Sequence, residues 1–225
     1  MWKPLRACVD LVYPRSCCAC GEAIFTPLEN GLCWDCRADV HPLGPPWCRV
    51  GGGVVAGRVD HAFTCADCVE NRPRYDRARS LYQYEGGVRE AIHALKYRRD
   101  FSVLPDLARL LAAGLRAHLP GEGNWVLTPV PLHRKRLAHR GFNQGRELIR
   151  AVRRLEPGVR CWEGLRKIKD TESQTRLSKA ARRTNVRGAF RAVQSSPPDT
   201  VVLVDDVMTT GATLDACASV LKKSG

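Results

Sequence analysis

The feature that most constrains the fold is a run of four apolar residues, Val201 to Val204, followed at once by two aspartates and a turn rich in threonine and glycine. Continuous β-branched runs are typical of strands that are buried on both faces of a parallel sheet. Beyond the turn, apolar residues recur at helical spacing as far as Leu221. The order of strand, polar turn and helix predicts an α/β fold with a ligand at the carboxyl ends of its strands.

The turn from Asp205 to Thr213 has the donors and acceptors that a phosphorylated ribose needs. Its last main-chain N–H groups open a helix, where the helix dipole favours a phosphate, and Gly211 lets the backbone approach closely. Ionised Asp205 and Asp206 only accept hydrogen bonds, which suits the vicinal hydroxyls of a ribose. A simple helix cap would explain one aspartate but not two beside Thr-Thr-Gly-x-Thr. The candidate catalytic residues are Asp205 and Asp206, and the candidate phosphate-binding residues are Thr209, Thr210, Gly211, Ala212 and Thr213.

Weaker patterns extend the α/β interpretation towards the N-terminus. The composition changes after Pro73, and from there strand-like and helix-like segments alternate. Two prolines interrupt the apolar run near residue 130, which indicates a strand that ends at a loop. The predicted elements are a strand at 80–84, a helix ending near 95, a helix at 104–119, a strand at 125–130, a helix around 148–155 and a strand at 188–193.

Seven of the eleven cysteines follow a metal-binding pattern. Cys17 and Cys20 form one CxxC pair, and Cys33 and Cys36 form a second pair after twelve intervening residues. Each CxxC turn directs two sulfurs at one ion, and four thiolates complete a tetrahedral zinc site. Buried, unliganded thiols would not produce this spacing repeatedly. Four thiolates leave no open position, so we predict a structural zinc that stabilises a segment too short to bury its own core.

A second set of cysteines is one ligand short. Cys48, Cys65 and Cys68 supply three thiolates, and Gly51 stands where the CxxC spacing expects the fourth. His61 could complete the set through a ring nitrogen, although a histidine in a loop is more often only solvated. Without a fourth ligand, the second zinc site is expected to be weak or lost.

The basic charge of the chain is concentrated in one segment. Between Arg134 and Arg191 lie eighteen lysines and arginines against five acids, which accounts for the whole formal net charge of +13. Such a concentration attracts anions, either the phosphates of a small molecule or those of a nucleic acid strand. A solvated helix face is the alternative, but the segment is longer than one helix.

The sequence carries no signal for export or membrane insertion. No stretch approaches the roughly 20 consecutive apolar residues that a membrane span requires, and the N-terminus has no small-residue cleavage site. Cysteines arranged as CxxC pairs in a chain without an export signal are better explained by metal than by disulfides. These observations predict a soluble cytoplasmic protein.

The segment VVLVDDVMTTGAT resembles the ribose-phosphate-binding fingerprint of type I phosphoribosyltransferases, which use phosphoribosyl diphosphate with Mg²⁺. The wider chain is similar to the ComF/GntX family, competence-protein relatives with an N-terminal zinc ribbon and a phosphoribosyltransferase domain. The resemblance implies a mostly parallel phosphoribosyltransferase-type sheet flanked by helices, with residues 1–73 as the zinc-binding module and residues 74–225 as the phosphoribosyltransferase-like domain. The matching segments are 17–36, 94–97, 129–132, 140–144, 171–174, 183–185, Phe190 and the fingerprint itself.

The resemblance also assigns roles to basic residues outside the fingerprint. It implies that the loop after the strand ending at Val130 faces the diphosphate, with Arg136 and Arg140 beside it. Guanidinium groups in a proline-framed loop can bind a diphosphate through bidentate contacts. The residues after Arg140 can also form a helix entry capped by Asn143. Lys169 lies where such enzymes carry a mobile flap, so Arg136, Arg140 and Lys169 are the predicted diphosphate ligands.

The resemblance implies one departure at the carboxyl end. Relatives continue into another strand beyond the position that corresponds to Gly225. If the chain ends there naturally, its sheet is expected to lack an edge strand, which would lower stability or require a partner.

Two functions compete at this stage. The first is a phosphoribosyl diphosphate-binding protein that supports DNA uptake in natural transformation; as an enzyme it would be a glycosyltransferase that displaces diphosphate from the ribose. No sequence feature identifies an acceptor, so catalysis stays open while binding is predicted. The second is a zinc-ribbon adaptor that binds single-stranded DNA and keeps a non-catalytic phosphoribosyltransferase fold, with Trp34, Trp47 and Phe142 as stacking surfaces. Other DNA-uptake proteins are the expected partners in both cases.

Overall fold

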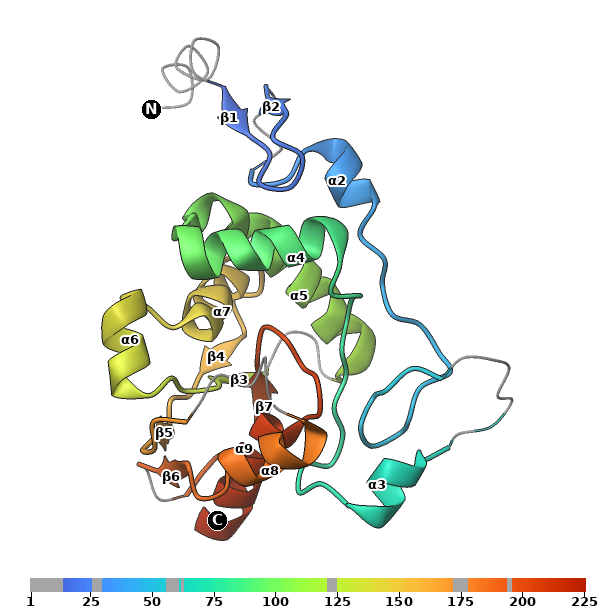
Figure 1. Ribbon diagram of the computed structural model, residues 1–225, viewed down its shortest axis with the longest axis vertical. Helices are drawn as coiled ribbons and strands as arrows, with labels where there is room; N and C mark the ends of the chain where they lie inside the picture. The colour runs from blue at the N-terminus through green and yellow to red at the C-terminus, as the bar shows by residue number, and fades with distance from the viewer. Residues whose placement is uncertain are drawn as a thin grey trace.

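A three-stranded parallel sheet forms the centre of the larger part of the molecule (Figure 1). The structure is a computed structural model that describes residues 14–25, 30–55, 61, 63–120, 125–171, 178–193 and 196–225. Strand β3 (Val126–Pro129) is central and fully buried, and it pairs with β4 (Arg160–Cys161) on one side and β7 (Val202–Val204) on the other. This arrangement confirms the predicted α/β fold with a parallel sheet.

Strand β7 corrects one expectation. The run from Val201 to Val204 was expected to be buried on both faces, but only Val204 is buried and the other three residues are half-buried. The reason is position: β7 pairs with β3 alone, and no other strand among the described residues adds to its free edge. An edge strand keeps one side open, so a continuous apolar run does not by itself establish a central strand.

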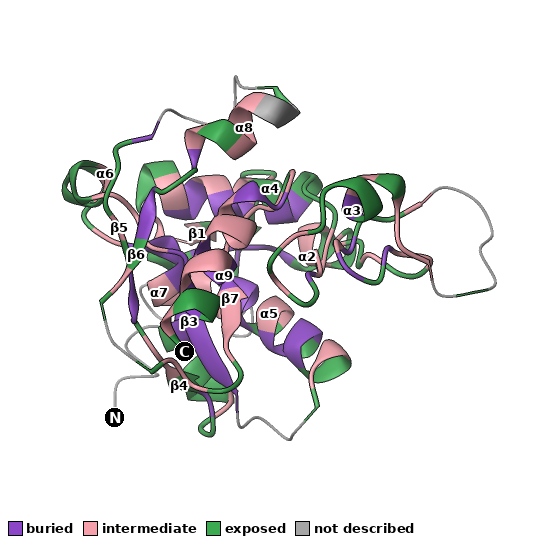
Figure 2. Ribbon diagram, turned by 90° about the horizontal axis from the view of Figure 1, so that it is seen from below, coloured by how far each residue is buried: buried purple, intermediate pink, exposed green. Residues whose placement is uncertain are grey.

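Two long helices cover the sheet. Helix α5 (Leu104–His118) packs along α7 (Gln144–Leu155), and α7 lies against β3. Buried residues alternate with exposed ones around α4 (Gly86–His93) and α5, as amphipathic helices require (Figure 2). The side chain of Asn143 caps α7 by accepting the N–H of Arg146 at 3.1 Å, which confirms the predicted helix entry. None of the helices in the described ranges is both long and apolar enough to cross a bilayer.

A pair of antiparallel strands and three helices complete this part of the fold. Strands β5 (Leu165–Lys167) and β6 (Phe190–Ala192) pair antiparallel and pack on α9 (Ala212–Ser224), which follows β7. Helix α6 (Arg134–Arg140) follows β3, and α8 (Lys179–Asn185) precedes β6. Between α4 and α5 lie a π-helical turn, η1 (Ala94–Arg98), and a short 3₁₀ helix, η2 (Phe101–Val103).

The cysteine-rich segment contacts the α/β part at two separate places. A two-stranded sheet of β1 (Arg15–Ser16) and β2 (Ala23–Ile24), with α2 (Trp34–Ala38), lies next to α4. Helix α3 (Ala66–Glu70) lies near α8, at the other end of the molecule in Figure 1.

The first cysteine region shares its hydrophobic core with the α/β part. Ile24, Leu32 and Cys33 belong to one buried cluster with residues of α4, η1 and α5. The buried carboxylate of Asp106 on α5 accepts the N–H groups of Gly31 and Leu32 at 2.9 and 3.1 Å. The packing therefore crosses position 73, and the predicted boundary between a 1–73 module and a 74–225 domain stays a prediction.

Most predicted elements of the α/β part are present, with one exception. The helix at 104–119, the strand at 125–130 and the strand at 188–193 are confirmed as α5, β3 and β6. The strand predicted at 80–84 is wrong: it contributes only an isolated bridge between Tyr82 and Pro42. Without a neighbouring strand to pair with, this extended segment forms a connection that lines a cavity.

Candidate functional site

The predicted sugar-phosphate turn lies at the carboxyl end of β7, beside the end of β3. The two strand ends are joined by the N–H of Val130, which donates to the carbonyl of Val204 at 3.0 Å. The turn runs from Asp205 to Gly211, and α9 begins at Ala212. Ligands of open parallel sheets bind at this edge, so the turn has the position that its sequence predicted.

Several main-chain donors of the turn are not used within the described part of the chain. The N–H groups of Thr209, Thr210 and Gly211 donate to no other described residue. Gly211 has a φ of +70°, a left-handed conformation that favours glycine, and it forms the N-cap of a thirteen-residue helix. The hydroxyl of Thr210 accepts the N–H of Ala212 at 3.4 Å. Unused N–H groups at the start of a helix can bind an anion.

The two aspartates meet a lysine from a distant part of the sequence. The ammonium of Lys96, in η1, forms a largely buried ion pair with Asp206. Burial raises the pKa of Asp205 to about 6, although the positive charges of Lys96 and Lys167 oppose this rise. Burial lowers the pKa of Lys96 to about 8, with the charge of Asp205 opposing the shift. The acid pair therefore lies in a poorly solvated, positively charged environment.

Lys96 is a site residue that the sequence interpretation gave no role. The segment 94–97 was noted only as part of the family resemblance. In the structure it forms a π-helical turn, an irregularity that often occurs at functional sites. No periodicity connects Lys96 with Asp206, because the contact depends on how η1 packs above the sheet.

Arg136 and Arg140, both on α6, surround the same centre. Their positive charges further lower the pKa of Lys96, which places them within its electrostatic range. Arg140 donates from Nη1 to Oε1 of Gln144 at 2.6 Å, and Arg136 donates from Nη2 to the carbonyl of Thr171 at 3.3 Å. The structure thus brings the predicted diphosphate arginines towards the acid pair.

Lys169 lies elsewhere. Its ammonium donates to the carbonyl of Arg187 at 3.1 Å, next to Gly188. The lysine whose positive charge acts on Asp205 is Lys167, two residues earlier, in β5. In a continuing strand, Lys167 and Lys169 would point to the same face. Strand β5 ends at Lys167, so Lys169 lies beyond it and points elsewhere. Lys169 remains a predicted ligand. Residues 172–174, part of a segment that matches the family, lie outside the described residues.

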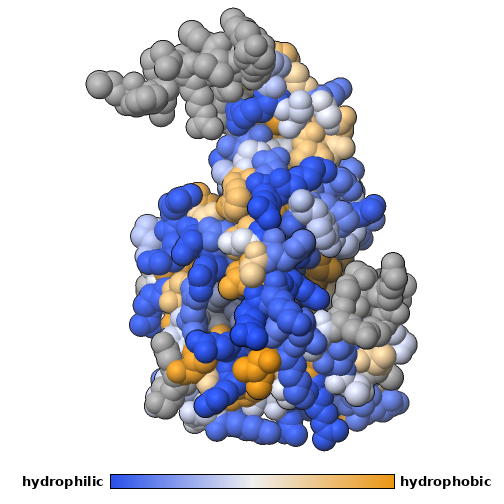
Figure 3. Space-filling view, turned by 60° about the vertical axis from the view of Figure 1, so that its left-hand side comes forward, coloured by the Kyte–Doolittle hydropathy of each residue, from blue (hydrophilic) through white to orange (hydrophobic). Residues whose placement is uncertain are grey.

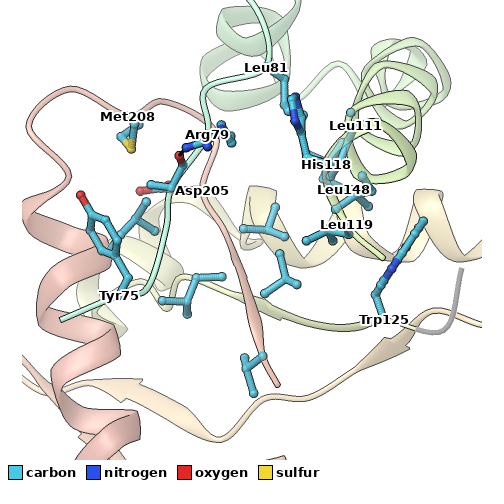
Figure 4. A pocket seen from close by; sticks show the side chains of 18 of the residues that line it. Tyr75, Arg79, Leu81, Leu111, His118, Leu119, Trp125, Leu148, Asp205 and Met208 are labelled. Carbon is cyan, nitrogen blue, oxygen red and sulfur yellow. Dashed lines mark hydrogen bonds between the residues drawn. The ribbon is translucent and has the colours of Figure 1, made fainter. Parts of the chain in front are cut away.

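A cavity of about 1300 Å³ opens beside the turn. Lys96, Asp205 and Asp206 line its polar end. Leu111, Leu119 and Trp125 line its apolar end, on the right of Figure 4. Tyr75, Arg79 and Met208 lie near Asp205, on the left of the same view. A site with a polar end and an apolar end is typical of small-molecule pockets.

The four cysteines of the first two CxxC pairs form a cluster that suits zinc. The sulfurs of Cys17, Cys20, Cys33 and Cys36 all lie within 4.8 Å of one another, and those of Cys20 and Cys33 are 3.7 Å apart. Tetrahedral zinc with bonds of about 2.3 Å separates its sulfurs by roughly 3.8 Å. The N–H of Cys33 points to the sulfur of Cys17 at 3.4 Å, a contact that stabilises a thiolate. The donor set therefore fits a structural zinc ion.

The second cluster contains three sulfurs. Those of Cys48, Cys65 and Cys68 lie within 4.8 Å of one another. No fourth described Cys, His, Asp or Glu joins them, so the described His61 is not part of the cluster. The structure supports the sequence expectation that this site is one protein ligand short.

The three aromatic candidates for base stacking differ in accessibility. Trp34 is 69% exposed. Trp47 packs edge-on against His118 and under the guanidinium of Arg79, and Phe142 packs against a neighbouring phenylalanine at 5.0 Å. Of the three, Trp34 alone presents a largely free ring.

Comparisons with known proteins support the resemblance. A model of the double zinc ribbon domain matches residues 8–69. The chain is 30% identical over 207 residues to competence protein F of Haemophilus influenzae, covering 88% of this chain and 86% of that relative. The chain belongs to the ComF family. The ComF-family chain is also 30% identical over 220 residues to the DNA utilization protein YhgH of Escherichia coli K12, covering 87% and 92% of the two chains.

A more distant relative agrees with this assignment. Competence protein ComFC of Bacillus subtilis is 26% identical to the ComF-family chain over 205 residues, covering 88% of this chain and 80% of that relative. No solved structure matches the chain. The double zinc ribbon match and the cysteine clusters together support structural zinc in this protein.

Proposed function

We propose that this protein binds phosphoribosyl diphosphate at the turn after β7 and supports DNA uptake. The observation that carries the proposal is the coincidence of unused main-chain donors and an acid pair on one turn, at the mouth of a large cavity. Helix-terminal N–H groups select a phosphate, and paired carboxylates select a diol. A ribose 5-phosphate presents both groups at the required ends.

The proposed binding mode assigns each part of the ligand to one side of the site. The 5-phosphate binds the N–H groups and hydroxyls of 209–213, at the start of α9. The ribose hydroxyls donate to Asp205 and Asp206. The diphosphate faces Arg136 and Arg140, which are oriented by Thr171 and Gln144 respectively.

The same arrangement suits displacement of the diphosphate. An acceptor would form a bond to the anomeric carbon of the ribose while the bond from that carbon to the diphosphate oxygen breaks and the diphosphate leaves with the electron pair. Mg²⁺ carried by the diphosphate supplies charge neutralisation on the leaving group. Arg136, Arg140 and Lys96 add positive charge on the same side, and Asp205 and Asp206 hold the ribose in place.

The proposed role in DNA uptake comes from the relatives. Two of them are named competence proteins and one is named a DNA utilization protein. Because each covers most of this chain, the proposed site and the proposed role refer to the same part of the protein.

The proposal also assigns zinc ligands to the two cysteine clusters. We assign Cys17, Cys20, Cys33 and Cys36 as ligands of one zinc ion, and Cys48, Cys65 and Cys68 as ligands of a second. Neither cluster lines the cavity at the turn, so neither zinc ion takes part in the proposed binding of phosphoribosyl diphosphate.

Calorimetric titration of the full chain with phosphoribosyl diphosphate and Mg²⁺ tests the proposed site. We expect saturable binding with one ligand per chain, and weaker binding of ribose 5-phosphate or diphosphate alone, since each offers part of the contacts. A chain that binds none of the three at millimolar concentration would refute the proposal. Diphosphate release in the presence of candidate acceptors then tests catalysis separately.

Binding is expected to depend on pH in a defined window. Above about pH 6 Asp205 is ionised and accepts the ribose hydroxyl, and below about pH 8 Lys96 stays charged. Affinity should therefore be highest between these values and fall by up to about tenfold per pH unit on either side. Calorimetric titrations repeated from pH 5 to pH 9, with all other conditions held constant, check this.

Two variants distinguish the titration of protein groups from the titration of the ligand in this pH profile. Lys96→Arg should flatten the alkaline limb, because a guanidinium keeps its charge. Asp205→Asn should remove the contribution of that acid and leave only the titration of the ligand's phosphate near pH 6. A wild-type affinity that is flat from pH 7 to 9 would contradict the assignment of Lys96.

A second candidate function is binding of single-stranded DNA, favoured by basic residues that the cavity does not use. Arg134, Lys135, Arg153 and Arg154 are exposed on α6 and α7. The face drawn in Figure 3 is largely hydrophilic, with hydrophobic residues in separate patches. We expect fluorescence anisotropy with an oligonucleotide to show binding that weakens steeply between 50 and 200 mM salt, by roughly twentyfold if three phosphates are contacted and roughly a hundredfold if five are contacted.

Charge reversal locates this surface. Replacing Arg153 and Arg154 by Glu should weaken oligonucleotide binding and leave phosphoribosyl diphosphate binding unchanged, because neither residue lines the cavity. Oligonucleotide binding that is absent at 50 mM salt would refute the second candidate without affecting the first.

A further inference from the structure

The loops that carry the two sets of cysteines have the same hydrogen-bond pattern. In the loop 17–22, the first residue donates its N–H to the carbonyl of the sixth at 2.7 Å, and the fifth donates to the carbonyl of the first at 2.9 Å. In the loop 48–53, the same two bonds measure 2.8 and 2.9 Å. The fifth residue of each is a glycine with positive φ, +82° and +69°. This correspondence places Gly51 at the position that Cys20 has in the first loop.

Gly51 faces the three sulfurs of the second cluster. A Cβ atom added to it would lie 2.8 Å from the sulfur of Cys68 and 4.0 Å from that of Cys48. The N–H groups of Gly51 and Cys65 point to the sulfur of Cys48 at 3.4 and 3.3 Å, as the N–H of Cys33 does in the first cluster. The second loop therefore keeps the geometry of a zinc-binding turn and lacks only the side chain of the fourth ligand.

The missing position is partly exposed. Cys20, its counterpart in the first cluster, is exposed, and Gly51 itself is half-buried between the buried Val50 and Gly52. No described Cys, His, Asp or Glu reaches the three sulfurs. No side chain of the described residues coordinates from this position, and an atom placed at the Cβ position of Gly51 requires the sulfur of Cys68, 2.8 Å away, to shift.

We propose that Cys48, Cys65 and Cys68 hold a zinc ion whose fourth coordination position, opposite Gly51, is open to an exchangeable ligand. Zinc with three protein ligands keeps water in its fourth position, whereas zinc with four thiolates is closed. The ligand class is a small thiol: it binds as a thiolate, the bound water leaves, and the thiol proton passes to solvent. The two zinc ions of this chain thus differ in chemistry, one closed and one open.

The surroundings of the open site favour an anionic ligand. Arg79 donates from Nη1 to the carbonyl of Cys48 at 3.3 Å, and its positive charge reaches the Cys48 sulfur. Tyr75 packs against the same cluster, and its hydroxyl lies 2.8 Å from where a Cβ of Gly211 would be. The open metal site is therefore adjacent to the turn after β7, although the inference does not depend on what that turn binds.

Cobalt substitution tests the open position. The full chain is loaded with Co²⁺ in place of zinc, and sulfur-to-cobalt charge-transfer absorption is followed as 2-mercaptoethanol is added. We expect two metal ions per chain and an absorption increase of about one part in seven, because one thiolate joins the seven of the protein. In Gly51→Cys the absorption should start at the higher level and not respond to the thiol. The backbone of Gly51 does not have a positive φ, so the substitution introduces no backbone strain, although the sulfur of Cys68 must shift to admit the new Cβ atom.

Three control variants make the result specific. Gly51→Ala adds a methyl group next to Cys68 without a donor, so it should reduce the response to thiol without raising the initial absorption. His61→Ala and Asp60→Ala should respond as the wild type does, because neither side chain is the fourth ligand in this proposal; Asp60 lies outside the described residues. One metal per chain, a wild type that does not respond to thiol, or a changed initial spectrum in either of these two variants would each overturn the proposal.

Discussion

Replacing Asp206 by Asn is expected to weaken binding of phosphoribosyl diphosphate by up to about a hundredfold. The substitution keeps the shape of the side chain and removes the charge that pairs with Lys96. A hydrogen bond to a charged group contributes about 1.5–3 kcal/mol, and each 1.4 kcal/mol corresponds to a factor of ten in affinity, so the contact of the ribose with this carboxylate accounts for the loss. The broken ion pair with Lys96 lowers the stability of the free protein in addition. The ribose also loses an acceptor for one of its hydroxyls. Calorimetric titration with Mg²⁺ present measures the loss.

Two further variants decide whether this loss is specific to the site. Thr210→Val removes one hydroxyl from the turn and keeps its volume, so we expect a smaller loss of about tenfold. Asp35→Asn makes the same chemical change on the exposed surface of α2 and should leave affinity unchanged. Zinc content and melting temperature serve as measures of the fold in all three. Wild-type affinity in both Asp206→Asn and Thr210→Val would refute the site assignment.

The parts of the site that the sequence predicted are those within one continuous segment. The turn from Asp205 to Thr213 carries its chemistry in consecutive residues, and the structure places it at the carboxyl end of β7 as expected. The contact of Lys96 with Asp206 could not be predicted in this way, because it joins η1 to the sheet across more than a hundred residues. Long-range contacts depend on tertiary packing, which no local pattern encodes.

The same limit explains the errors in the fold. Strands β4 and β5 have two and three residues, too short for alternation to be visible above chance. The segment 80–84 alternates as a strand does, but it pairs only through an isolated bridge between Tyr82 and Pro42 and does not join the sheet. The cysteine pattern was more informative, because the spacing of a metal-binding turn is fixed by covalent geometry and four sulfurs need only one ion to bring them together.

Replacing Cys33 by Ser is expected to have the largest effect on stability. Cys33 is one of four sulfurs of the first cluster and also part of the core that includes residues of α4 and α5. Structural zinc supplies about 10–16 kcal/mol in zinc-finger peptides, which is comparable to the 5–15 kcal/mol that stabilises a whole domain. We expect the variant to lose one zinc ion per chain and to melt far below the wild type, as measured by metal analysis and circular dichroism.

A neighbouring cysteine provides a matched control. Cys18 lies between two ligands, is half-buried and does not belong to the four-sulfur group, so Cys18→Ser should keep both zinc ions and lower stability by about 1 kcal/mol or less. Equal zinc content and equal melting temperatures for Cys33→Ser and the wild type would contradict the assigned structural role.

The two clusters should also differ in how their loss spreads through the molecule. The second cluster has a small core of three buried residues, Cys48, Val50 and Cys68, whereas the first shares its core with α4, η1 and α5. Loss of the first zinc should therefore increase hydrogen exchange in α4 and around Leu32, where Asp106 holds the main chain, while Cys65→Ser should affect mainly α3. A chelator should remove the second zinc first, because three thiolates hold it less tightly than four. Hydrogen exchange that rises equally in α4 for both variants would show instead that the two clusters stabilise one cooperative unit.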